Sequence, residues 1–118
     1  MTPQDLLDRQ ELISRAERSD LRVAPRLAAE LRSLELPAYR CPSVDTHRLI
    51  NIYERRRRRL SADTVLARQI DAWLEALRGR ETVRLVSVED ATDPLALLIS
   101  EDRSELLAAI WPRATIDP

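Results

Sequence analysis

Apolar residues in the first eighty positions recur every three or four residues, which is the spacing of amphipathic helices. Together with capping and breaking residues, this spacing predicts helices over about 3–19, 25–35, 46–60 and 64–78. No Gly or Pro lies between Ser43 and Arg78, so one continuous bent helix over 46–78 is an alternative to the last two.

The fourth predicted helix carries the narrowest apolar seam of the chain. Its members are Leu66, Ile70, Trp73 and Leu77. At about 100° per residue these side chains fall within an arc of roughly 60°, so the seam must face a core or a partner. Gly79 follows, where a glycine in the left-handed conformation can end the helix. A homodimer through this seam is one prediction.

After Gly79 the pattern changes to the alternation of a strand. Residues 82–88 alternate and are rich in β-branched side chains, residues 89–93 are polar, and residues 95–99 are apolar throughout, which predicts a β-hairpin. Both faces of the second strand need cover, and a two-stranded ribbon alone is marginally stable in water. We therefore expect a third strand, from Leu36–Arg40 or from a second copy of the chain, and so a homodimer through the hairpin.

The last segment predicts a closing helix, because Ser100–Ser104 can cap it and Pro112 can stop it. Its apolar residues are Leu106, Leu107, Ile110 and Trp111. The predicted fold is α+β: an N-terminal bundle of three to four helices followed by a β-hairpin and a closing C-terminal helix. A length of 118 residues predicts a single domain, with a helical part over 1–79 and the hairpin plus C-terminal helix over 80–118.

Composition excludes several kinds of reaction centre. Gly79 is the only glycine and all 19 basic residues are arginines, which excludes a glycine-rich phosphate loop and a lysine Schiff base. One Cys and one His cannot complete a zinc site unaided. Cys41 and His47 are the one available nucleophile–base pair, and without a glycine-built oxyanion site nearby we predict no catalysis by them. We expect a protein that is not an enzyme and uses no cofactor and no metal.

The sequence predicts a cytoplasmic protein without a membrane partner. Its longest apolar run has five residues, Leu95–Ile99, which is too short for a transmembrane helix. Its first residues lack the basic and apolar regions of a signal peptide. The single cysteine cannot form an internal disulfide, which suits a reducing compartment.

A run of five arginines at residues 55–59 is the strongest local feature. Five consecutive helical residues turn through more than a full circle, so the run cannot form one stripe and part of it must point toward the protein. Residues 40–59 hold seven arginines against two acids. A solvated helix end with ion pairs and a binding surface both explain the run. The candidate partner-binding residues are Arg48, Tyr53, Arg55, Arg56, Arg57, Arg58 and Arg59.

The predicted function is that of a small non-enzymatic protein-binding module, such as an adaptor, inhibitor, immunity-type or assembly factor. Its arginine-rich helix would contact an acidic surface of another protein. Bidentate pairs between arginines and carboxylates would supply orientation and association rate.

Residues 46–100 also resemble a winged helix-turn-helix. The resemblance lies in the order of helix, turn, helix and hairpin, with Ser61, Thr64 and Val65 at the start of the second helix. It implies a DNA-binding transcriptional regulator of bacterial type, in which residues 82–99 form the wing. Arg55–Arg59 and Arg68 would then contact phosphates, so nucleic acid is the alternative partner.

Overall fold

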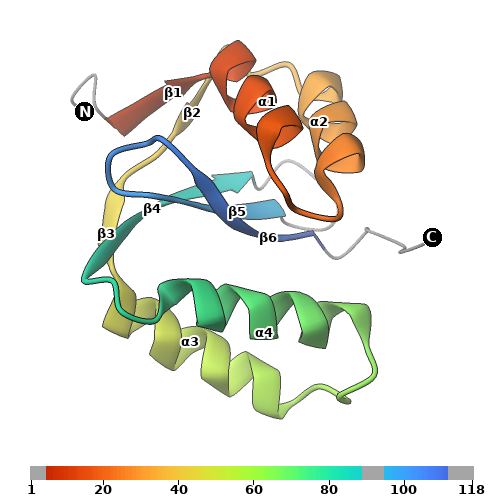
Figure 1. Cartoon of the computed structure of the whole chain (residues 1–118), viewed down its shortest axis with the longest axis vertical. Helices are drawn as coiled ribbons and strands as arrows, with labels where there is room; N and C mark the ends of the chain where they lie inside the picture. Colours follow the sequence, from red (N-terminus) through yellow and green to blue (C-terminus); the bar gives the residue numbers. More distant parts are fainter. Residues whose placement is uncertain (1–4, 89–94, 112–118) are drawn as a thin grey trace.

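Two pairs of helices cover opposite faces of an antiparallel sheet in the computed structural model of the chain (Figure 1). The structure describes residues 5–88 and 95–111. In chain order the elements are β1 (Leu6–Asp8), α1 (Arg9–Arg18), α2 (Ala24–Ser33), β2 (Ala38–Arg40), β3 (Ser43–Asp45), α3 (Thr46–Arg58), α4 (Val65–Leu77), β4 (Thr82–Val88), β5 (Leu95–Ile99) and β6 (Leu106–Ile110).

The central sheet has the strand order β3-β4-β5-β6, and each neighbouring pair is antiparallel. A separate ribbon pairs β1 with β2. In Figure 1 the α1–α2 pair lies above the sheet and the α3–α4 pair below it, so the chain forms three layers. Within the described residues, β3 and β6 are the two edges of the central sheet.

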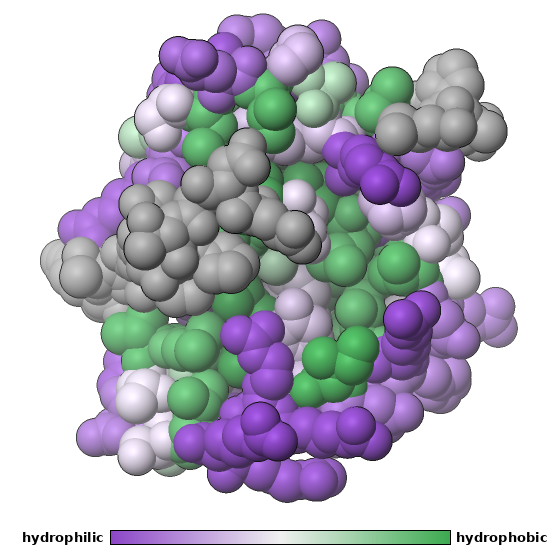
Figure 2. Space-filling view, turned by 180° about the vertical axis from the view of Figure 1, so that it is seen from behind, coloured by the Kyte–Doolittle hydropathy of each residue, from purple (hydrophilic) through white to green (hydrophobic). Residues whose placement is uncertain are grey.

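The sheet separates two apolar cores. Along β5, Leu97 and Ile99 pack with residues of α1 and α2, whereas Ala96 and Leu98 pack with residues of α3 and α4. Every residue of β5 is buried, so the prediction that both of its faces need cover is confirmed. In Figure 2 hydrophilic side chains are most frequent at the top and the bottom of the molecule, and many of the visible hydrophobic ones lie in the band between.

The apolar seam of α4 faces the second core. Ile70, Trp73 and Leu77 are fully buried there with Val83 and Leu98. The hairpin of β4 and β5 is also enclosed, because β3 and β6 flank it. A homodimer through the seam or the hairpin stays a prediction, although a single copy of the chain already buries most of both.

The predicted order of elements is wrong in two respects. The helices do not form one N-terminal bundle, because the sheet lies between the α1–α2 pair and the α3–α4 pair. The residues predicted to form the closing C-terminal helix form a strand instead, because Leu106–Ile110 is β6 and pairs with β5. These five residues are all apolar, a pattern that fits a buried helix and a strand covered on both faces equally well. In the structure these residues pair with β5, and they are therefore a strand.

The residues expected to cap that helix instead form a tight turn between β5 and β6. The hydroxyls of Ser100 and Ser104 donate to the Asp102 carboxylate at 2.7 and 2.6 Å, and Arg103 adopts a φ of 65°. The hydrogen bonds from Ser104 and Ser100 lower the pKa of Asp102 to about 2. Ser and Asp favour helix caps and turns for the same hydrogen-bonding reason, so the sequence did not separate the two structures.

The third strand of the sheet also differs from the prediction. β3 supplies it, whereas residues Ala38–Arg40 pair with β1 in the separate ribbon. The residues of β1 belonged to the first predicted helix, but α1 begins only after Asp8, whose carboxylate accepts the N–H of Gln10 at 2.8 Å and caps the helix.

The alternative of one bent helix over 46–78 is also resolved. Residues 59–64 separate α3 from α4, and the Thr64 hydroxyl caps α4 by accepting the N–H of Ala67 at 3.2 Å. None of the described helices combines the length and the apolar character needed to cross a bilayer.

Candidate functional site

The arginine run on α3 divides between inward and outward side chains. Arg57 turns inward and donates from Nε to Oδ1 of Asp71 on α4 at 2.8 Å. The guanidinium carbon of Arg56 lies 5.1 Å from the centre of the Tyr53 ring, which is a cation–π contact. Arg57 is half-buried, and the other four arginines of the run, Arg56 included, are exposed. Arg56 and Arg57 therefore make contacts within the protein itself.

Tyr53 lies inside the second core. Its side chain is only 8% exposed, and its ring packs against Trp73 at 4.8 Å between centroids. Burial raises the pKa of its hydroxyl, while the nearby charge of Arg56 acts in the opposite direction. The predicted contact residues that are exposed on α3 and at its end are Arg48, Arg55, Arg56, Arg58 and Arg59.

The outer face of α3 nevertheless presents a basic stripe. At about 100° per residue, Arg48, Ile52, Arg55 and Arg59 fall within an arc of roughly 60°. Ile52 is 43% exposed, and among the described residues only Leu6 and Leu36 are other large apolar residues exposed to this degree. The stripe is a candidate contact for an acidic surface.

The structure does not bring Cys41 and His47 together. The Cys41 thiol is fully buried in the core beneath α1 and α2, whereas His47 is exposed in the first turn of α3 on the other side of the sheet. Burial raises the pKa of the thiol, and the neighbouring charge of Arg84 only partly opposes that effect.

Cys41 should therefore react slowly with thiol reagents in the folded protein. Only the thiolate is nucleophilic, and a buried thiol with a raised pKa must wait for local opening. Labelling at pH 8 should be at least about 100-fold slower in buffer than in 6 M urea. Equal rates in the two solvents would show that the thiol is accessible and the described packing wrong.

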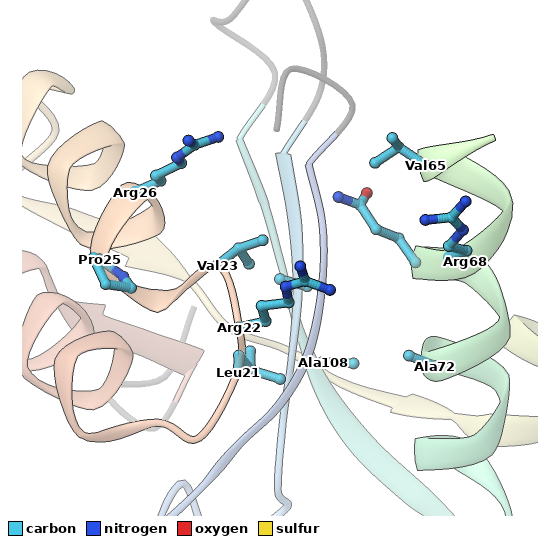
Figure 3. Close-up of a pocket in the computed structure, with 11 residues that line it drawn as sticks. Leu21, Arg22, Val23, Pro25, Arg26, Val65, Arg68, Ala72 and Ala108 are labelled. Atoms are coloured by element: carbon cyan, nitrogen blue, oxygen red, sulfur yellow. The ribbon is translucent and has the colours of Figure 1, made fainter. Parts of the chain in front are cut away.

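A groove runs along the open edge of β6. It lies between the start of α2 and α4 and encloses a volume of about 540 Å³. Figure 3 shows Arg22 and Val23 on one side of the strands and Arg68 on the other. The lining residues are Leu21, Arg22, Val23, Pro25, Arg26, Val65, Arg68, Gln69, Ala72, Ala108 and Ala109. We call this site the β6 groove.

The charged residues that line the β6 groove are basic in the described part of the chain. They are Arg22, Arg26 and Arg68, and none of the eleven described lining residues is acidic. The other side chains are mainly apolar and come from both helical layers. Such a lining suits a ligand that carries both carboxylates and apolar groups.

The hydrogen-bonding direction of β6 follows from the sheet. In an antiparallel ladder, successive residues direct their N–H and C=O groups to alternate sides. The N–H of Leu85 on β4 donates to the carbonyl of Pro42 beside β3 at 3.0 Å, which fixes the alternation across the sheet. Following the registers of β5 and β6, the backbone N–H and C=O groups of Ala108 and Ile110 point toward β5. Ala109 faces the open edge, on the floor of the groove.

Gln69 confirms this direction at the end of the strand. Its side-chain oxygen accepts the N–H of Trp111 at 2.8 Å, and its nitrogen donates to the carbonyl of Trp111 at 3.1 Å. The amide of Gln69 thus bonds to β6 as the backbone of a neighbouring strand would. Within the described residues, no further strand pairs with this edge.

The sequence prediction missed the β6 groove. Its lining comes from three segments that are far apart in the chain, and one of them, β6, was predicted to be a helix. The polar residues 89–93, predicted to connect the two strands of the hairpin, lie outside the described residues. Among residues 5–88 and 95–111, no group of three or more potential metal ligands comes together. No family model, no curated protein and no solved structure matches the chain, so the site itself carries the functional argument.

Proposed function

We propose that the protein is a non-enzymatic binding module that holds an acidic, extended segment of a partner protein in the β6 groove. The observation that supports this proposal is the lining of the groove, which among residues 5–88 and 95–111 has three arginines, no acid and apolar walls, beside a strand edge that no described strand pairs with. Carboxylates on the partner would pair with the guanidinium groups, often through two hydrogen bonds each.

The apolar walls favour a polypeptide over nucleic acid. Leu21, Val23 and Val65 offer surface to aliphatic side chains, which a sugar–phosphate backbone lacks. The winged-helix alternative also loses its geometric support, because the hairpin of β4 and β5 is the centre of the sheet rather than a projecting wing. DNA binding is therefore not the function we propose.

The basic stripe of α3 supports a second contact with an acidic partner surface. Arg55 and Arg59 are exposed on the same face of α3 as Ile52. The sequence analysis predicts the partner contact in this region. The groove and the stripe are both basic, so an acidic partner could bind at either one. Matched substitutions in each surface tell which of them binds the partner.

The groove predicts binding of a short acidic peptide. The probe is a fluorescein-labelled octapeptide, Glu-Glu-Val-Val repeated twice, which in extended form presents both Glu and Val on each face. Replacing Glu by Gln in the peptide should weaken binding at least about tenfold, because each lost charge-assisted hydrogen bond is worth roughly 1.5–3 kcal/mol. Fluorescence anisotropy measures the affinity.

The matched variants are Arg22→Gln with Arg68→Gln in the groove and Arg55→Gln with Arg59→Gln on α3. Both pairs remove the same charge from exposed positions. The groove pair should weaken binding at least about tenfold and the α3 pair less than about twofold. The reverse result would move the contact to α3. Equal affinity for the Glu and Gln peptides would contradict an acidic ligand.

A further inference from the structure

We infer that the partner segment joins the central sheet as a fifth strand, pairing its backbone with the open edge of β6. This inference rests on the proposed function and specifies its mode. The partner would be recognised first by its extended backbone and second by its carboxylates.

The edge of β6 has the groups that such pairing needs. The N–H and C=O of Ala109 face the groove, while Ala108 and Ile110 bond to β5. An added strand lies about 4.8 Å from its neighbour, so it would occupy the floor of the groove between the two helical layers. The small side chains of Ala108 and Ala109 leave space above and below that floor.

Gln69 limits the stretch of β6 that an added strand can pair with. Its amide already satisfies the N–H and the C=O of Trp111, so an incoming strand can pair at Ala109 but not at Trp111. At the other end, Leu98 pairs with Ala108 and Ile99 with Leu106, which makes Leu107 the extra residue of a β-bulge. The regular part of the edge is therefore short, and only a short stretch of partner can pair with it.

Alternation along the added strand fixes the side-chain chemistry. Successive side chains of a strand point to opposite faces, so they would meet the α2 wall and the α4 wall in turn. Arg22 lies on the first wall and Arg68 on the second. A segment with an acid on each face would therefore satisfy both arginines, which is the pattern of the octapeptide above.

The first test measures the exchange of backbone amides with and without the Glu-Glu-Val-Val octapeptide by nuclear magnetic resonance. At saturating peptide, exchange of the Ala109 amide should slow at least about tenfold, because a hydrogen-bonded amide exchanges only on opening. The amide of Ala108 faces β5 and should be protected equally in both states. Unchanged exchange at Ala109 in the bound state overturns the strand pairing.

The second test replaces Ala109 by Pro. Proline is tolerated on an edge strand where its missing N–H points outward, and here it removes the donor that the partner needs. Ala109→Pro should weaken peptide binding at least about tenfold. The matched control is Ser43→Pro on the opposite edge, at β3, where the alternation also directs the N–H outward. It should leave the affinity within about twofold.

The outcomes separate the two proposals. Peptide binding that survives Ala109→Pro and leaves Ala109 exchange unchanged overturns strand pairing but keeps the acidic groove. No peptide binding to the unmodified protein overturns both. A dimer in sedimentation that Ala109→Pro converts to a monomer would show that a second copy occupies the edge, and that also overturns pairing with a partner segment.

Discussion

Replacing Trp73 by Ala should lower the free energy of unfolding by about 3–5 kcal/mol, which is the usual cost of deleting a large buried aromatic side chain. Trp73 is fully buried between α4 and the sheet, against Tyr53, Leu98 and Ile110. A domain of this size has a total stability of roughly 5–15 kcal/mol, so the variant should be close to unfolding at 37 °C. Urea titration followed by circular dichroism measures the loss.

Trp73→Phe is the matched control. The indole nitrogen of Trp73 is buried without a hydrogen-bond partner in the described structure, so phenylalanine gives up no such bond. It keeps most of the aromatic contact and should lose less than half as much stability as the alanine variant. A loss below about 1 kcal/mol for Trp73→Ala would contradict its place in the core. Dissociation of a dimer without unfolding would instead assign the α4 seam to an interface.

Replacing Arg84 by Ala should lower the free energy of unfolding by about 2–4 kcal/mol, because the change removes a largely buried guanidinium together with two hydrogen bonds to backbone carbonyls. The Arg84 side chain is only 11% exposed and lies on β4. It donates to the carbonyl of Glu101 at 2.9 Å and to that of Cys41 at 3.0 Å. Its guanidinium also lies 3.5 Å from the Asp5 carboxylate and 3.7 Å from that of Glu101.

Arg84 thus links β4 to Cys41 before β3, to Glu101 in the β5–β6 turn and to Asp5 before β1. Arg84→Lys tests whether charge alone is enough, because a lysine keeps the charge but has no planar fork to reach both carbonyls. Its stability should fall between those of the native protein and Arg84→Ala, again measured by urea titration. A lysine variant as stable as the native protein would reduce the role of Arg84 to an ion pair.

Much of the secondary structure could be predicted from local pattern. The 3.6-residue spacing located α2, α3 and α4, and the alternation of residues 82–88 located β4. β1 and β3 were missed because a strand of three residues carries no measurable period. The segment Leu36–Arg40 was predicted as a possible third strand and does contain β2, but β2 pairs with β1 and not with the hairpin. β6 was missed because an unbroken apolar run fits both structures, and its bulge at Leu107 also disturbs any alternation.

The candidate site could not be predicted, because its residues become neighbours only through the fold. The sequence emphasised the arginines of 55–59, where local density is high. Arg22 and Arg68 are far apart in sequence, and nothing in their spacing indicates a shared groove. Only the layered arrangement, with β6 at an edge between the α1–α2 connection and α4, brings them to opposite walls.

The open edge of β6 has a further consequence for the behaviour of the protein in concentrated solution. An unpaired strand edge can pair with the same edge of another copy and so start aggregation, and the net charge of −1 gives the whole molecule little mutual repulsion. The guanidinium groups at its rim act as gatekeepers, because two such edges brought face to face would place like charges together. A groove that lost its arginines in order to bind a neutral ligand would therefore also lose this protection against aggregation.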